Sequence, residues 1–237
     1  MACGFRYNKL KLSLNVHGMR RQTAWVAVTV LVLLIVWTLR TYMKAMPGVK
    51  YQINHTWNSA EVDHRPVEIT LEASPEGVVM GVVAPFFNDP GNPGGAPGKP
   101  FPQLWDHEVV EAFFLNDAEQ YLEVELCPHG QHLVLMLNGR RKTIKDALPL
   151  TFTAEVKGSE WRGQAIIPAG YFPPNVVKFN AYAIHGSGED RVYEALYPAP
   201  ADLFTDPDFH RLEYFQPIDF VKLLNTTSAL STEWKEI

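Results

Sequence analysis

Cysteine is scarce in this chain. Only Cys3 and Cys127 occur among its 237 residues, and a long apolar run lies between them. If that run crosses a membrane, the two thiols lie on opposite sides and cannot form an intramolecular disulfide. The body must then be held by its hydrophobic core alone. An unpaired thiol is also more typical of a cytosolic protein than of a secreted one.

Acidic side chains are absent from residues 1–45, so all 26 Asp and Glu residues lie in the remainder of the chain. The basic residues of this first stretch are Arg6, Lys9, Lys11, Arg20, Arg21, Arg40 and Lys44. The body is therefore acidic, and its sequence shows no basic stripe. Nucleic-acid binding needs Lys and Arg to displace counterions from phosphate, so we predict no nucleic-acid partner.

The chain lacks the spacing of the common catalytic and nucleotide-binding motifs. The glycine-rich stretch 91–98 does not follow the P-loop pattern. The stretch 185–188 reads HGSG and is not the G-x-S-x-G of a nucleophile elbow. We therefore predict no catalytic residues, and we favour a binding protein over an enzyme.

Metal-ligand spacing is weak as well. Cys127, His129 and His132 have a zinc-like spacing, but Pro128 and Gly130 favour a tight turn, and a fourth ligand is not evident. We predict no cofactor. One alternative is calcium bound by oxygen ligands from a single loop. Its candidate ligands are Asp202, Asp206 and Asp208.

One long hydrophobic run is present. Residues 24–39 carry no charge, and with their flanks (23–43) they reach the length that crosses a bilayer. Trp25, Trp37 and Tyr42 lie near the ends, where aromatic rings favour the membrane interface. The run predicts a transmembrane signal anchor at 23–43. A cleaved signal peptide is the main alternative.

The excess of Lys and Arg before the run predicts that residues 1–22 form a cytoplasmic tail. The protein would then be a type II membrane protein whose body faces the lumen or the outside. Two glycosylation sequons begin at Asn54 and Asn225 and agree weakly with this topology. Translation from Met46 would instead give a cytosolic form.

The body shows the alternation of short strands and turns. Residues 67–72 alternate apolar and polar side chains, and Asn138-Gly139 is a strong hairpin signal. Eight to ten strands with regular turns predict an all-β sandwich over residues 49–220, followed by a C-terminal tail at 221–237. The expected strands are 67–72, 77–83, 108–115, 121–126, 133–137, 152–156, 161–167, 178–185, 191–196 and 212–215.

Several motifs, in order along the body, resemble the family 9 carbohydrate-binding modules. The resemblance rests on the stretches 105–113 (WDHEVVEAF), 121–130 (YLEVELCPHG), 161–168 (WRGQAIIP), 179–184 (FNAYAI) and 208–213 (DFHRLE). The chain is also similar to a group of animal proteins that share the CPHGQHL and YFPPN stretches. For that group the resemblance implies no particular activity.

The resemblance to the modules implies a jelly-roll-like sandwich of two sheets. It also implies glycan binding, in some relatives with bound calcium. The sequence departs from the sugar-binding members because the pair of aromatic rings that clamps their ligand has no evident counterpart. A structural or protein-interaction domain that has lost sugar binding therefore stays open as an alternative.

The candidate binding residues gather around one strand. Tyr121, Glu123 and Glu125 share one face of the expected strand 121–126, and Glu111 comes from the strand before it. Carboxylates accept hydrogen bonds from sugar hydroxyls, and aromatic rings stack on sugar faces. Trp105 and Trp57 are the further stacking candidates.

Two other interpretations of this face stay open. The first is a solvated sheet face with polar cross-strand pairs. The second makes two of the carboxylates a glycosidase acid–base pair, although no two are singled out by the sequence.

Overall fold

The computed structural model describes residues 28–34, 48–224 and 232–235. The chain divides into two compact units, Met1–Ala45 and Met46–Ile237. Residues 28–34 are helical and belong to the predicted anchor; the rest of that anchor and the predicted tail at 1–22 lie outside the described residues. Within the described ranges, no helix is long and apolar enough to cross a membrane. The anchor at 23–43 stays a prediction.

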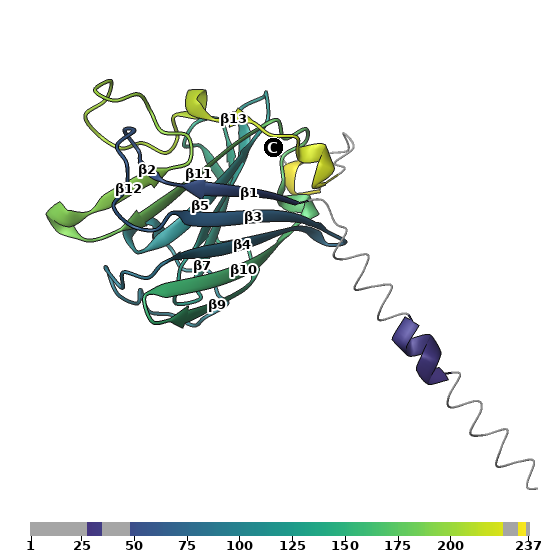
Figure 1. Cartoon of the computed structure of the whole chain (residues 1–237). Helices are drawn as coiled ribbons and strands as arrows, with labels where there is room; N and C mark the ends of the chain where they lie inside the picture. The colour runs from purple at the N-terminus through teal and green to yellow at the C-terminus, as the bar shows by residue number, and fades with distance from the viewer. Residues whose placement is uncertain (1–27, 35–47, 225–231, 236–237) are drawn as a thin grey trace, which may run out of the picture. The chain divides into compact units, whose positions relative to one another are not determined.

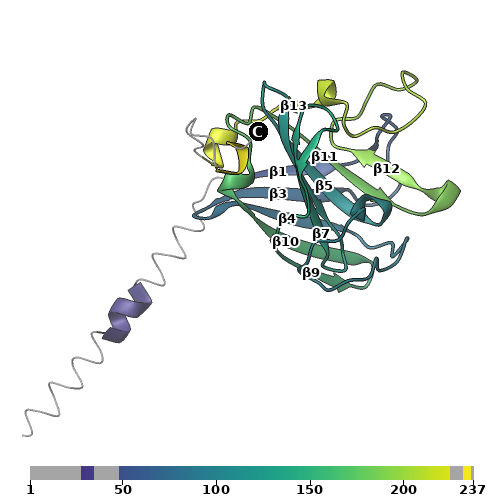
Figure 2. The ribbon, with the colours of Figure 1, turned by 180° about the vertical axis from the view of Figure 1, so that it is seen from behind.

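The second unit is an all-β sandwich of two antiparallel sheets (Figure 1; the reverse view is Figure 2). The smaller sheet has five strands in the order β1-β3-β4-β10-β9. Its strands are β1 (Gly48–Ile53), β3 (Val67–Ser74), β4 (Gly77–Pro85), β9 (Thr151–Lys157) and β10 (Glu160–Pro168).

The larger sheet has eight strands in the order β2-β12-β11-β5-β6-β7-β8, with β13 also pairing with β11. Its strands are β2 (His55–Thr56), β5 (Val109–Leu115), β6 (Gln120–Leu126), β7 (His132–Asn138), β8 (Thr143–Lys145), β11 (Lys178–His185), β12 (Val192–Ala195) and β13 (Gln216–Pro217). The predicted β-sandwich is confirmed.

The main core lies between the two sheets and follows the period-two pattern of the sequence. On β6, Leu122, Val124 and Leu126 point into this core, as Ile69 does from β3. The ring of Phe114 on β5 packs against three other phenylalanines, at ring-centroid distances of 5.0, 5.2 and 5.7 Å. Burial of these faces against each other is what holds the sheets together.

A second hydrophobic cluster covers the opposite, outer face of the larger sheet. Phe113, Leu135 and Tyr182 from the sheet pack there against Leu104 and Leu212 from loops. Short 3-10 helices occur in these loops, at Leu104–Asp106 (η1) and Leu212–Tyr214 (η4). The outer face is thus largely shielded from solvent, and the loops that shield it position the candidate site.

Two parts of the C-terminal region differ from the sequence-based expectation. The closing strand predicted at 212–215 is wrong, because Leu212–Tyr214 forms a 3-10 helix. Leu212 and Phe215 are three residues apart and both buried, which fits three residues per turn better than strand alternation. The predicted tail at 221–237 also contributes to the main core, through Leu223 and Trp234.

Replacement of Phe114 tests the packing between the sheets. The Phe114 side chain is fully buried, so Phe114→Ala removes a large ring and leaves a cavity. We expect it to lower the free energy of unfolding by about 3–5 kcal/mol in chemical denaturation. The control Leu203→Ala, at a side chain that is 58% exposed, changes it by less than about 0.5 kcal/mol. Similar values for the two variants would contradict this account of the core.

Candidate functional site

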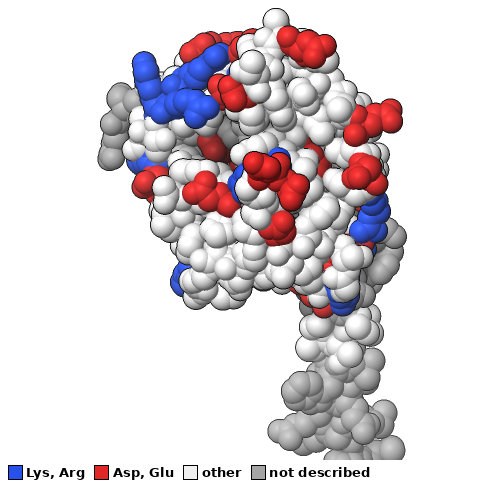
Figure 3. All heavy atoms as spheres, turned by 90° about the vertical axis from the view of Figure 1, so that its left-hand side faces the viewer, with Lys and Arg blue, Asp and Glu red and all other residues white. Residues whose placement is uncertain are grey.

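A pocket of about 380 Å³ opens on the outer face of the larger sheet. Figure 3 shows a hollow on this side of the molecule, with Lys and Arg atoms gathered at one border and Asp and Glu atoms around it. The floor carries Glu111 from β5 and Glu123 from β6. The remaining lining residues are Trp105, Asp106, Leu135, Leu137, Arg141, Thr143, Ile184, Arg191, Tyr193, Pro207, Asp208, Phe209 and His210.

Three glutamates cluster beneath this face because of the strand register. Glu111 on β5 pairs directly with Glu125 on β6, and Glu123 lies two residues before Glu125 on the same face of β6. All three are buried, with exposed fractions of 2%, 5% and 0% for Glu111, Glu123 and Glu125. Both carboxyl oxygens of Glu125 and the Oε1 atom of Glu111 have no hydrogen-bond partner within the described part of the chain.

Burial favours the protonated form of these carboxyl groups by raising the pKa of each. It raises the pKa of Glu123 to about 8, although the nearby Arg141 guanidinium acts in the opposite direction. The pKa of Glu111 is raised well above its usual value by burial and by the charge of Glu123. The pKa of Glu125 is likewise raised, first by burial and then by Glu111 and Glu123. At neutral pH the floor therefore presents neutral carboxyl groups, which both donate and accept hydrogen bonds.

Two arginines, Arg141 and Arg191, line the pocket. The Arg191 guanidinium donates to the backbone carbonyls of Asp106 (3.0 Å) and Trp105, and so ties the β11–β12 connection to the loop that carries Trp105. The Arg141 guanidinium donates to the Asp208 carboxylate at 2.6 Å. Burial alone would raise the pKa of Asp208. The backbone N–H of His210 and the charge of Arg141 lower that pKa instead, so the Asp208 carboxylate stays ionised.

Tyr121 supports the pocket from below and is not one of its lining residues. Its hydroxyl accepts a hydrogen bond from the backbone N–H of Arg141 at 3.0 Å and lies 2.7 Å from the Nδ1 atom of His210. Burial lowers the pKa of His210 to about 4, so the ring is neutral at physiological pH. Tyr121 therefore holds two lining residues in place.

The predicted binding residues lie at different places in the structure. Trp105, Glu111 and Glu123 line the pocket, and their role in ligand binding stays a prediction. Glu125 lies too deep to reach it, and the solvated-face interpretation is wrong because loops cover this face. Trp57 does not line the pocket; the Arg211 guanidinium lies over its ring at 5.7 Å in a separate, smaller crevice.

The remaining predictions fall at other places. Asn54 is exposed, and Asn225 lies outside the described residues. The turn at Cys127 forms, with the N–H of Gly130 donating to the Cys127 carbonyl, and burial raises the pKa of that thiol to about 12. Among the calcium candidates Asp202, Asp206 and Asp208, the last is paired with Arg141. Calcium binding there stays a prediction.

Sequence reasoning missed the two arginines, His210 and Phe209 as lining residues. They come from loops far apart in the sequence, and no spacing signal connects them. It also missed a group of potential metal ligands, His64, His185 and Glu194, which lies apart from the pocket lining. These residues stand on three separate segments, so only the folded chain brings them together.

A scan against protein-family models finds no match. Several curated proteins are clearly related to this chain. The chain is 56% identical to the mouse UPF0462 protein C4orf33 homolog over 190 residues, and this alignment covers 78% of this chain and 96% of the mouse protein. The human UPF0462 protein C4orf33 is 55% identical over 190 residues, covering 78% of this chain and 92% of that protein.

This chain belongs to the UPF0462 family. The zebrafish UPF0462 protein C4orf33 homolog is 56% identical over 170 residues, which cover 70% of this chain and 86% of that protein. Among solved structures, this UPF0462 chain is similar to a putative carbohydrate-binding protein from Bacteroides uniformis. That similarity has a TM-score of 0.53 and 13% sequence identity, and covers 71% of this chain and 84% of the other. At this identity it shows a shared fold.

The protonated floor predicts a pH-dependent stability in this UPF0462 protein. Between pH 4.5, the usual pKa, and about 8, Glu123 is ionised in the unfolded chain but protonated in the fold. The unfolded state then binds fewer protons, so the free energy of unfolding falls as pH rises through this window. Glu123→Gln cannot ionise, and we expect it to reduce that fall by on the order of 2 kcal/mol.

The measurement is chemical denaturation of the wild type and the variant at both ends of this window. The exposed Glu155→Gln serves as the control and is expected to keep the wild-type pH dependence. Equal pH dependence in the wild type and Glu123→Gln would show that Glu123 ionises normally in the fold.

Proposed function

We propose that the pocket on the outer face of the larger sheet binds a carbohydrate and performs no catalysis. The observation that carries the proposal is the position of Trp105. Its side chain lines the pocket and is 40% exposed, although it is a large apolar ring. An exposed ring beside buried hydrogen-bonding groups is suited to a sugar, which has an apolar ring face and polar hydroxyl edges.

The polar groups around Trp105 fit the edges of such a ligand. Neutral carboxyl groups of Glu111 and Glu123 donate to and accept from hydroxyls, while Arg141 donates and Asp208 accepts. Protonated floor carboxyls also avoid the repulsion that buried like charges would create. A neutral polyhydroxyl compound can satisfy this mixed set, because each hydroxyl is both donor and acceptor.

Three further observations support a carbohydrate. The volume lies in the range of pockets that enclose small ligands. The fold neighbour from Bacteroides uniformis is described as a putative carbohydrate-binding protein. Sugar-binding relatives clamp their ligand between two aromatic rings, and in this chain Phe209 and Tyr193 line the same pocket as Trp105. Either of these two rings is a candidate for the second aromatic contact.

Replacement of Trp105 tests this proposal. Glycan-array screening of the full chain selects a ligand, and titration calorimetry then measures its dissociation constant. We expect Trp105→Ala to weaken binding by about tenfold, since a lost stacking contact is worth roughly 1.4 kcal/mol. Trp57→Ala, at a tryptophan outside the pocket, should change the affinity by less than about twofold.

Thermal unfolding of both variants confirms that each remains folded. Absence of any glycan ligand, or equal losses in the two variants, would contradict carbohydrate binding in this pocket. New reducing ends that appear with wild type and disappear with Glu123→Gln would instead identify a glycosidase.

A further inference from the structure

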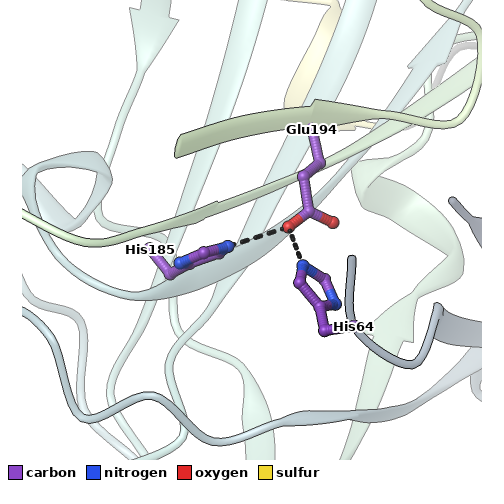
Figure 4. Close-up of side chains that lie close together, drawn as sticks. All are labelled: His64, His185 and Glu194. Carbon is purple, nitrogen blue, oxygen red and sulfur yellow. Dashed lines mark hydrogen bonds and ion pairs between the residues drawn. The ribbon is translucent and has the colours of Figure 1, made fainter. Parts of the chain in front are cut away.

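A second cluster of polar side chains lies on the opposite face of two strands that line the pocket. On β11, Ile184 lines the pocket and His185 points to the other side; on β12, Tyr193 lines the pocket and Glu194 points to the other side. Strand alternation sets this arrangement. His64, from the segment between β2 and β3, completes the cluster (Figure 4).

The three side chains converge on one carboxylate oxygen. The Oε1 atom of Glu194 lies 2.9 Å from Nε2 of His64 and 3.0 Å from Nε2 of His185. Glu194 is fully buried, and the His64 and His185 side chains are only 16% and 12% exposed. The potential ligand atoms of the three residues all lie within 4.8 Å of one another.

The hydrogen bonds of His64 favour a cation, either a proton or a metal ion, between its ring and the Glu194 carboxylate. Its Nδ1 atom lies 3.0 Å from the backbone carbonyl of Arg65, and a carbonyl only accepts, so Nδ1 carries a proton. In the neutral ring, Nε2 then presents a lone pair to Oε1 of Glu194. Two acceptors at 2.9 Å repel each other unless a proton or a metal ion lies between them. A backbone carbonyl on Nδ1 is also how metal-ligating histidines are commonly oriented.

A small cavity adjoins two of the three side chains. Its volume is about 10 Å³, roughly enough for one water-sized atom, and its lining includes His185, Glu194 and Phe87 but not His64. The second oxygen of Glu194, Oε2, is buried and has no hydrogen-bond partner among the described residues. The ring of Phe87 stacks on His185 at 3.6 Å and meets His64 edge-on at 5.1 Å, which forms an apolar wall beside the cluster.

The donor set selects the class of metal. Two imidazole nitrogens and one carboxylate suit zinc and similar divalent transition ions better than calcium or magnesium. Bonds of roughly 2.0–2.2 Å in tetrahedral geometry place donor atoms about 3.3–3.6 Å apart. The observed distances of 2.9 and 3.0 Å are shorter than that spacing, so the side chains would move apart by roughly half an ångström to admit the ion. Three protein ligands leave one coordination position for water or another ligand.

We propose that His64, His185 and Glu194 form a binding site for a divalent transition-metal ion of the zinc type. This site is independent of the carbohydrate proposal, because none of its residues lines the pocket. The metal would bridge the segment before β3 to both β11 and β12. It would thereby fix the strands whose other faces present Ile184 and Tyr193 to the pocket.

Metal titration of the full chain tests the site. Metal-free protein is titrated with zinc at neutral pH against a chromophoric chelator, and cobalt is used in parallel for its ligand-field absorption. We expect one equivalent of zinc with a dissociation constant on the order of 1 μM or tighter. Cobalt should give the intense visible bands of a tetrahedral site.

The variants His64→Ala and Glu194→Gln should each weaken zinc binding by at least about 100-fold and abolish the cobalt bands. The matched control is His55→Ala, at a histidine outside the cluster, which should bind zinc as the wild type does. His64 is in a loop, so its variant keeps the test valid if Glu194→Gln fails to fold. Absence of tight zinc binding, or binding that survives His64→Ala, would overturn the proposal. The contact between His64 and Glu194 would then be a hydrogen-bonded ion pair with a proton between the two groups.

Discussion

Burial of three glutamates on the outer face of the larger sheet constrains the whole candidate site. Glu111, Glu123 and Glu125 lie on adjacent strands within reach of one another, in a face that loops cover. Three charged carboxylates in such a place would be strongly unfavourable, because burial and mutual repulsion both disfavour the ionised form. The fold accommodates them as neutral acids, and two of them form the floor of a pocket.

The covering loops have a double role. Leu104, Phe209 and Leu212 extend the second hydrophobic cluster over the sheet, which buries the glutamates. The same loops carry Trp105 and His210 to the pocket and provide carbonyls that orient Arg191. The burial of the floor glutamates and the placement of Trp105 and His210 at the pocket therefore depend on the same packing. The two faces of β11 and β12 are connected in the same way. Ile184 and Tyr193 line the pocket, and the residues that follow them, His185 and Glu194, belong to the cluster with His64.

The sequence predicted those features that depend on local periodicity. Alternation along 121–126 placed Leu122, Val124 and Leu126 in the core, and the opposite face correctly grouped Tyr121 with Glu123 and Glu125. It could not predict the burial of that face, because this burial comes from two separate loops, one before the strand at Leu104 and one about 90 residues after it at Phe209 and Leu212. The strand expected at 212–215 failed for a related reason: contact with the second cluster selected a 3-10 helix. Arg141, Arg191 and the residues around Glu194 had no motif, so only the tertiary structure reveals their neighbours.

The protonation state of the three glutamates is the central claim, and carbon-13 NMR of glutamate side-chain carboxyls measures it directly. Resonances are assigned to Glu111, Glu123 and Glu125 by their loss in single Glu→Gln variants. At about pH 6.5 exposed glutamates are ionised, and these three carboxyls are predicted to keep the chemical shift of the protonated form. Titration of all three near pH 4.5, together with the exposed glutamates, would contradict the account of a neutral pocket floor.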